Sequence, residues 1–457
     1  MLWTSAEIAA ATGGQASEGF AVTGVTFDSR EVEPGHLFIA LKGAATDGHQ
    51  FLSDVFARGA AGAIVSHPVD QPHVLVADTT AALNALAVAA RRRMAGPVIG
   101  VTGSVGKTGT KEALFAALDR AVPGTVHRSV KSYNNHTGVP LSLARMPAGT
   151  RFGVFEMGMN HAGELAALTR LVRPNVAIIT AIAPAHTEFF SGEAAIADAK
   201  AEIFQGLEAG GTAIVPFDSQ HGARLAAAAR THAAHVISFG LNEGADVRAL
   251  ETMRTATGGT FVTARLRERE LGFTISQPGM HWVSNALAVL AAVEAVGVDV
   301  AVAALALADL GGLAGRGARF AACVPAGGTA LVIDESYNAN PSSMRATLAV
   351  LGAEPAKRKL AVLGEMRELG RDSDSYHAGL AEPLEEAGVE RALLVGAGMA
   401  PLAKVLEGRL DFVHVADAAA ARDQLSSMLA DGDAVLVKGS NGVGLAAVVA
   451  ALKSGTA

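Results

Sequence analysis

The chain has 457 residues, 50% of them hydrophobic, and a formal net charge of −7 at pH 7. This length predicts two or three domains, and the lack of a basic excess argues against a general nucleic-acid or membrane-surface role. The single cysteine, Cys323, excludes an internal disulfide, and no stretch reaches the roughly 20 apolar residues of a membrane span, so we expect a cytoplasmic protein.

The first part of the chain contains short apolar runs. Three of them predict strands, at 36–41, 62–67 and 73–78, and a helical pattern follows at 79–94. The sequence Ala-Gly-Pro at 95–97 then breaks the pattern. We therefore predict a first boundary there, with a small α/β domain over residues 1–95.

From Pro97 onward the pattern is strand, loop and helix, repeated. Strands are predicted at 97–102, 152–158, 175–183 and 211–216, and helices at 107–118, 161–172 and 193–207. Buried strands that alternate with helices imply a parallel sheet. Residues 245–277 alternate instead like antiparallel strands, which favours a hairpin at the sheet edge. Two further helices are predicted at about 281–295 and 299–309.

The glycine-rich segment 310–317 predicts a hinge, because the α/β rhythm restarts after it. Five strands are predicted beyond it, at 330–335, 359–364, 391–398, 412–417 and 434–439. The predicted fold class is therefore α/β with three domains. These are a small α/β N-terminal domain (1–95), a central P-loop-type parallel-sheet ATPase domain (96–313) and a C-terminal Rossmann-like α/β domain (314–457).

The stretch GVTGSVGKTGTKEAL, residues 100–114, lies between a predicted strand and a predicted helix. Its glycines miss the usual phosphate-loop spacing, because Val101 stands where the first glycine is expected. Amides at a helix start still favour an anion, Lys107 can reach terminal phosphates, and Thr108 can ligate Mg²⁺. The alternative is a glycine turn that only caps a helix.

Two residues support a metal–nucleotide centre beside this loop. Glu156 ends one predicted strand and His186 follows another. Ligands collect at the carboxyl ends of the strands in an open parallel sheet, so both residues would share an edge with Lys107. A lone Glu or His at such a place is more often a cap or loop residue, but three groups on one edge favour a site.

Lys200 is the most informative residue of the predicted helix 193–207. Its spacing from Ile196, Ile203 and Phe204 turns it inward with the apolar face. An unpaired buried ammonium is costly. Three interpretations remain open: an ion pair with a carboxylate, a lysine that reaches outward to solvent, or carbamylation by CO₂ to give a carboxylate that could hold Mg²⁺.

A series of motifs resembles the Mur ligase family in order along nearly the whole chain. They are TGSVGKT (102–108), SYNNHTGVPLSL (132–143), FEMGMNHAGE (155–164), APAHTEFFSG (183–192), AKAEIF (199–204), GMHWVSNAL (279–287) and DESYNANPSSM (334–344). The glycine spacing of the first is that family's own. SYNANP, with TFDSR (26–30) and DGHQF (47–51), resembles the branch that adds D-alanyl-D-alanine to UDP-N-acetylmuramoyl-tripeptide in peptidoglycan synthesis.

The resemblance implies roles for particular residues. Lys107, Lys200 and His186 would be catalytic. ATP would be bound by Thr102, Gly103, Ser104, Val105, Gly106, Lys107, Thr108, His281, Asn285, Arg316, Asp334, Tyr337 and Asn338. A pair of Mg²⁺ ions would be held by Thr108, Glu156, His186 and carbamylated Lys200. The muramoyl-tripeptide and D-Ala-D-Ala would contact Ser29, Arg30, Lys42, Asp47, Gly48, His49, Asn134, Asn135, Lys438 and Ser440.

The mechanism implied is activation of the tripeptide carboxylate as an acyl phosphate, attack by the dipeptide amine and loss of phosphate. The third domain would close over the site about the hinge near Arg316 and bind D-Ala-D-Ala, and we expect a monomer that binds neither nucleic acid nor membrane. Two departures from the family pattern are Asn441, where Arg is common, and His136, where an acidic residue is frequent.

Three alternatives remain open. One is a sister ligase of the Mur or folylpolyglutamate type that adds a different amino acid, against which SYNANP argues. Another is a P-loop ATPase that couples hydrolysis to motion and needs no acceptor. A third is a catalytically inactive UDP-sugar-binding protein, against which Lys107, Glu156, His186 and Lys200 argue.

Overall fold

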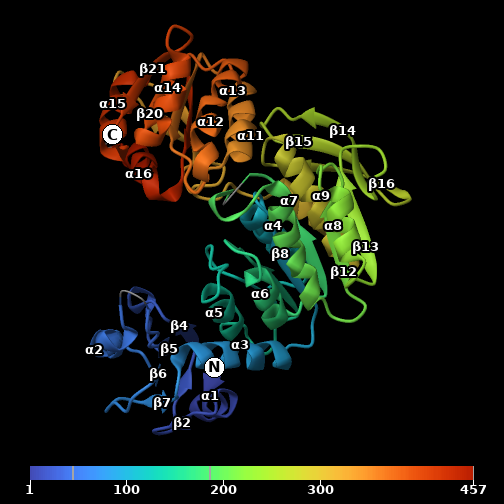
Figure 1. Cartoon of the computed structure of the whole chain (residues 1–457), viewed down its shortest axis with the longest axis vertical. Coiled ribbons are helices and arrows are strands. Elements are labelled where there is room, and N and C mark those ends of the chain that lie inside the picture. The colour runs from blue at the N-terminus through green and yellow to red at the C-terminus, as the bar shows by residue number, and fades with distance from the viewer. Residues whose placement is uncertain (44–45, 185–186, 456–457) are drawn as a thin grey trace.

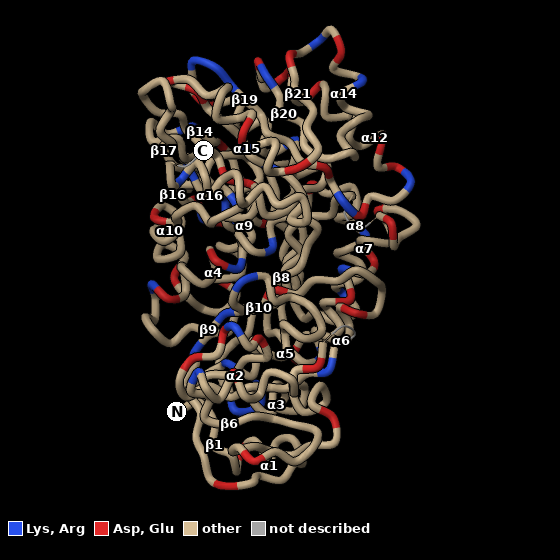
Figure 2. The backbone as a smooth tube through the Cα atoms, turned by 90° about the vertical axis from the view of Figure 1, so that its left-hand side faces the viewer, with Lys and Arg blue, Asp and Glu red and all other residues tan. Residues whose placement is uncertain are grey.

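The computed structural model describes residues 1–43, 46–184 and 187–455. Three sheets follow one another along the long axis of the molecule, and the two chain ends lie in opposite end regions (Figure 1). Lys and Arg are interspersed with Asp and Glu over the full length, without a long stretch of one sign (Figure 2). Within the described part of the chain, no helix is both long enough and apolar enough to cross a membrane.

The first sheet has the order β2-β7-β6-β5-β4, parallel from β4 to β7, with β2 antiparallel at the edge. It confirms the three predicted strands. The bounds are β2 Gln15–Ala16, β4 Gly24–Thr26, β5 His36–Ile39, β6 Gly62–Val65 and β7 His73–Leu75, with β1 Trp3–Thr4 and β3 Ala21–Val22 paired separately. The α-helices here are α1 Ser5–Thr12, α2 Leu52–Ala57 and α3 Thr79–Arg93.

Helix α3 joins the first sheet to the central part of the molecule. It begins where Asp78 accepts hydrogen bonds from the amides of Thr80 and Ala81, as an N-cap should. Its buried face, which includes Leu83 and Leu86, belongs to one apolar cluster that also contains residues of both neighbouring regions. The predicted limit at residue 95 therefore falls just after a shared helix.

The central sheet has the order β16-β15-β14-β13-β12-β11-β8-β10-β9. It is parallel from β9 to β14, and the hairpin predicted at its edge is confirmed as β15 and β16. The strands are β8 Val98–Thr102, β9 Val126–Arg128, β10 Phe152–Glu156, β11 Val176–Ile179, β12 Thr212–Pro216, β13 His235–Gly240, β14 Val247–Arg254, β15 Thr260–Leu266 and β16 Arg269–Ile275.

The helices on this sheet are α4 Lys107–Ala121, α5 Gly138–Ala144, α6 Glu164–Val172, α7 Glu193–Ala201, α8 Gly222–Ala229, α9 Met280–Ala295 and α10 Val300–Ala308. One prediction was wrong: α7 does not continue to 207 but tightens into a 3₁₀ turn at Glu202–Gly206. The cause is tertiary, because the Thr169 hydroxyl donates to the Ile203 carbonyl at 2.7 Å, and a Cβ on Gly206 would lie 2.3 Å from the Thr169 carbonyl.

The third sheet has the order β17-β18-β22-β19-β20-β21, parallel except for the edge strand β17. It confirms the five predicted strands. The strands are β17 Ala318–Cys323, β18 Thr329–Glu335, β19 Arg358–Gly364, β20 Arg391–Val395, β21 Asp411–Val415 and β22 Asp433–Lys438. The helices are α11 Pro341–Gly352, α12 Ser373–Ala378, α13 Ala381–Glu386, α14 Ala400–Leu406, α15 Ala418–Met428 and α16 Ala446–Ser454.

Candidate functional site

A cavity of about 430 Å³ lies between the central and third sheets. Its walls come from the loop after β8, the start of α9, the segment before β17 and the loop after β18. Many predicted site residues line it: Ser104, Val105, Gly106, Lys107, Asn134, Glu156, Lys200, His281, Asn285, Arg316, Tyr337, Asn338 and Lys438. The fold therefore brings together residues that are far apart in the sequence.

The loop between β8 and α4 is shaped by two glycines with positive φ. A Cβ on Gly103 (φ 152°) would lie 1.9 Å from the Thr180 hydroxyl, and one on Gly106 (φ 86°) would lie 2.8 Å from the Asn285 side-chain oxygen. The Thr180 hydroxyl also donates to the Val105 carbonyl at 2.5 Å. Among the described residues no side chain caps the start of α4, and Gly106 and Lys107 there line the cavity, which suits a phosphate.

Lys107 is folded back onto this loop. Its ammonium donates to the Gly103 carbonyl at 2.7 Å. Burial lowers its pKa, the nearby charge of Glu156 opposes that change, and Arg316 adds to it. A cation with one carbonyl partner inside a cavity is placed to accept an anionic ligand.

Glu156 ends β10 and is only 1% exposed. Its carboxylate accepts from the Thr108 hydroxyl at 2.8 Å and from the Asn134 amide at 2.7 Å, and the Lys111 ammonium lies 4.0 Å away. A carboxylate beside a hydroxyl is an oxygen donor set of the kind that Mg²⁺ prefers, so these residues fit the predicted ion. The described residues contain no group of three or more His, Cys, Asp or Glu side chains placed to hold a metal.

Lys200 on α7 lines the same cavity and is 2% exposed, so the inward orientation predicted from its spacing is confirmed. Burial holds its pKa well below the usual value, and the charge of Lys107 adds to that effect. Within the described ranges, no carboxylate lies at ion-pair distance from its amine, which removes support for the ion-pair interpretation. This shift is toward the neutral amine, which is the form that reacts with CO₂. His186 lies outside the described residues, so its predicted role stays a prediction.

The third domain supplies cations and a stacked ring. The Arg316 guanidinium lies 4.1 Å from the centre of the Tyr337 ring and donates to the Ser132 hydroxyl at 3.3 Å. The Lys438 ammonium donates to the Asn338 carbonyl at 2.9 Å and lies 3.5 Å from the Glu335 carboxylate. Burial raises the pKa of Glu335, which Lys438 opposes, and burial lowers the pKa of Lys438.

Some predicted residues of the central and third domains do not line the cavity. Thr102 and Thr108 are buried at the ends of β8 and α4. Asp334 accepts from the Gly315 amide at 2.8 Å and so ties the predicted hinge to β18. Asn135 accepts from the first amide of α5, at Gly138, at 2.9 Å, and the Ser440 hydroxyl accepts from the Arg367 amide at 3.0 Å.

The predicted residues of the first domain form a separate group that does not line this cavity. The Arg30 side chain, 84% exposed, is paired with Asp28 at 2.7 Å. The His49 ring lies between the Asp47 carboxylate, at 2.6 Å, and the Ser66 amide, at 3.0 Å. Ser29 lies in the 3₁₀ turn Ser29–Glu31, and Gly48 begins the 3₁₀ turn Gly48–Phe51. The backbones of Lys42 and Asp47 form an isolated antiparallel β-bridge.

Sequence reasoning missed several residues of the site. Ser132, Trp282, Glu335 and Asn340 line the cavity, and Lys111 is buried beside Glu156. The four-residue step from Lys107 to Lys111 on one helix was an available signal. Asn441 and His136, the two departures from the family pattern, are both exposed. Next to Asn441, a Cβ on Gly442 would lie 2.0 Å from the Arg367 guanidinium.

Comparisons with known proteins cover almost all of the chain. Three family models match: the Mur ligase family catalytic domain over residues 21–99, the Mur ligase middle domain over 101–293, and the Mur ligase glutamate ligase domain over 319–441. The chain is 32% identical to the UDP-N-acetylmuramoyl-tripeptide–D-alanyl-D-alanine ligase of Rickettsia prowazekii, over 98% of this chain and 99% of that one.

Solved structures are similar over the same extent. A crystal structure of MurF from Acinetobacter baumannii has a TM-score of 0.85 and 32% identity, and covers 99% of both chains. MurF ligase from Thermotoga maritima in complex with ADP has a TM-score of 0.78 and 26% identity, and covers 95% of this chain and 97% of that one. The similarity therefore extends through all three sheets.

Proposed function

The chain belongs to the Mur ligase family, and we propose from this premise that it joins D-alanyl-D-alanine to UDP-N-acetylmuramoyl-tripeptide with cleavage of ATP, in peptidoglycan synthesis. The observation that carries the proposal is similarity to ligases of this activity over 98% of the chain, including the phosphate loop and the cavity beside it. The family, the three-domain α/β fold and the ATP-dependent ligase activity predicted from the sequence are confirmed.

ATP binds, in this proposal, with its phosphates at the start of α4. The free amides of the loop and Lys107 neutralise phosphate charge, and Arg316 approaches from the third domain. Lys107 exchanges its bond to the Gly103 carbonyl for a phosphate oxygen. Tyr337 and His281 line the same cavity and would contact the nucleoside.

Glu156 and Thr108 would hold Mg²⁺, and Lys200 would contribute a second anionic group after carbamylation. In that reaction the Lys200 amine forms an N–C bond to CO₂ and releases a proton, which replaces a buried amine by a carboxylate. Two observations support this assignment: Thr108 pairs with Glu156, and no described carboxylate lies at ion-pair distance from Lys200. When bound, the ion would screen the charge of the transferring phosphoryl group. His186 is kept as a further predicted ligand.

The tripeptide carboxylate attacks the terminal phosphorus of ATP, which releases ADP and leaves an acyl phosphate. The D-Ala-D-Ala amine then attacks the acyl carbon, and the tetrahedral intermediate collapses to the amide and phosphate. Water must be kept from the acyl phosphate, so we propose that the third domain closes about residues 310–317. Solution scattering should then show compaction when an ATP analogue and both substrates are added together.

The direct test is ATP-dependent ligation of labelled D-Ala-D-Ala to UDP-N-acetylmuramoyl-tripeptide. We expect product only when ATP and Mg²⁺ are both present. Faster ligation of glutamate or of a free diamino acid would place the chain in a sister branch. ATP hydrolysis that needs no acceptor, or substrate binding without turnover, would favour the other two alternatives. We further propose a cytoplasmic monomer, to be checked by mass measurement in solution and by cell fractionation.

A further inference from the structure

One loop of the central domain contacts all three domains. It spans residues 129–137, between β9 and α5. Lys131 and Tyr133 reach the first domain, Ser132 accepts from Arg316 before the third sheet, and Asn134 donates to Glu156 at the end of β10. A movement of this loop would therefore change its contacts with the first domain and also its contacts with Glu156 and Arg316 at the cavity.

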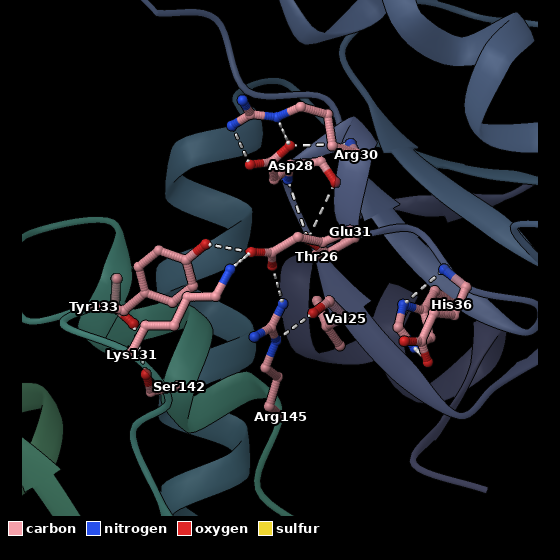
Figure 3. Close-up of polar contacts among 12 residues, drawn as sticks. Val25, Thr26, Asp28, Arg30, Glu31, His36, Lys131, Tyr133, Ser142 and Arg145 are labelled. Carbon is pink, nitrogen blue, oxygen red and sulfur yellow. Dashed lines mark hydrogen bonds and ion pairs between the residues drawn. The ribbon is translucent and has the colours of Figure 1, made fainter. Parts of the chain in front are cut away.

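On the side of the first domain, the contacts converge on Glu31 (Figure 3). The Glu31 carboxylate, 22% exposed, accepts from the Lys131 ammonium, from the Tyr133 hydroxyl at 2.9 Å and from the Arg145 guanidinium at 3.4 Å. Burial raises the pKa of Glu31, but these donors together bring it below its usual value, so the carboxylate stays charged near neutral pH.

Two further contacts flank the same segment of the first domain. Arg145 also donates to the Val25 carbonyl at 2.5 Å, and the rings of Phe27 and Tyr133 lie 5.9 Å apart. The segment 25–31, which carries the proposed substrate residues Ser29 and Arg30, is thus attached to the central domain at both of its ends. Glu31 is the attachment nearest to those two residues.

On the side of the nucleotide site, the loop is held in an unusual conformation. The backbone φ of Lys131 is 52°, a left-handed conformation that residues other than glycine rarely adopt. Its carbonyl accepts from the buried Lys111 ammonium at 2.9 Å, while its own ammonium contacts Glu31. Lys131 is therefore fixed from one side by α4 and from the other by the first domain.

We propose that Glu31 is a positioning residue that acts through residues 131–134 to orient Glu156 and Arg316, and so couples the occupancy of the first domain to Mg²⁺–ATP binding. The inference rests on the proposed function, because the coupled ligands are the muramoyl nucleotide and ATP. Glu31 would do more than hold the first and central domains together, because Asn134 of the same loop hydrogen-bonds to Glu156 directly. Reciprocity requires that each ligand tighten the binding of the other by the same factor.

The test uses the full chain and a non-hydrolysable ATP analogue with Mg²⁺, with the dissociation constant measured by calorimetry. We expect Glu31→Gln to weaken analogue binding about tenfold, the lower end of the loss that follows substitution of residues that orient metal ligands. UDP-N-acetylmuramoyl-tripeptide should tighten analogue binding by the wild type and do so less in the variant. Tyr133→Phe removes one of the same hydrogen bonds and should have a smaller effect in the same direction.

Glu33→Gln is the matched control. It removes the same charge two residues away. Among the described residues the polar partner of the Glu33 side chain is His36 of the same domain, so binding should match the wild type. The double variant Glu31→Gln/Asn134→Ala should be no weaker than Asn134→Ala alone, because both changes act on one path. Unaltered analogue binding in Glu31→Gln, or effects of the two substitutions that multiply, would overturn the proposal. Because this readout needs no dipeptide, it remains decisive even if D-Ala-D-Ala ligation fails.

Discussion

The cavity beside the β8–α4 loop and the proposed substrate segment of the first domain, residues 25–31, hold their cations in different environments. In the cavity, Lys107 and Lys200 are enclosed, and burial lowers their pKa values. In the first domain, Arg30 is exposed and already paired with Asp28. The cavity therefore encloses two lysines that have no ion-paired carboxylate among the described residues, whereas the first domain presents an arginine whose partner must be exchanged. Loss of a cation should accordingly be more damaging in the cavity.

The largest effect is expected for Lys107→Ala. The charge of Lys107 acts most strongly where phosphate charge is redistributed in the transition state, so ligation should fall on the order of a thousandfold. Among the described residues, the Lys107 ammonium hydrogen-bonds only to the Gly103 carbonyl, so the thermal midpoint should change little. Steady-state ligation and thermal unfolding measured together check both statements, and near-normal turnover would refute the assignment of the phosphate site.

Lys200→Ala should also be nearly inactive, and a small added carboxylate such as formate should restore part of the rate. The reason is that, in the proposed function, the carbamate and not the amine would supply the ligand to Mg²⁺. Carbon-13 NMR after exposure to labelled bicarbonate should show a carbamate signal in the wild type and none in the variant. A free amine at Lys200 in a fully active, CO₂-containing sample would contradict this prediction.

A smaller effect is expected for Arg30→Ala. We predict that KM for the muramoyl nucleotide rises about tenfold while kcat changes little, as expected when one charge-assisted hydrogen bond is lost from ground-state binding. The side-chain hydrogen bond from Arg30 is the main reason that the pKa of Asp28 is about 2, so Asp28→Asn is a useful companion variant that frees Arg30. An equal fall of kcat in Arg30→Ala would mean that the two regions do not differ as described.

How far the sequence predicted this structure depends on the range of the interactions involved. The strands β8, β10 and β18 were predictable because their apolar runs are buried, and the orientation of Lys200 followed from helical spacing. The end of α7 was not, because it depends on Thr169, which lies 34 residues away from Ile203. The contact of Glu31 with Lys131 joins residues 100 apart, and no local pattern reports it.

The smallest expected effect is a pH dependence that comes from His281 in the cavity wall. Burial, and then the charge of Lys438, lower the pKa of His281 to about 4, whereas an unfolded histidine titrates near 6.5. Between these values the unfolded chain binds more protons than the folded one, so stability rises with pH through this window and is lost as pH falls through it. The thermal midpoint should therefore increase by about 1–3 °C from this residue alone.

In His281→Gln that part of the pH dependence should vanish, while His232→Gln, which changes an exposed histidine, should leave it intact. Because the His281 ring is already neutral near pH 6.5, its titration should not affect binding of the Mg²⁺–ATP analogue at that pH. The pH profiles of binding for the wild type and His281→Gln should therefore coincide near pH 6.5. An inflection near pH 6.5 that is present in the wild type and absent in His281→Gln would show that the cavity admits water to His281. The cavity would then be more exposed to solvent, and so more like the first-domain segment, than the burial of its lysines indicates.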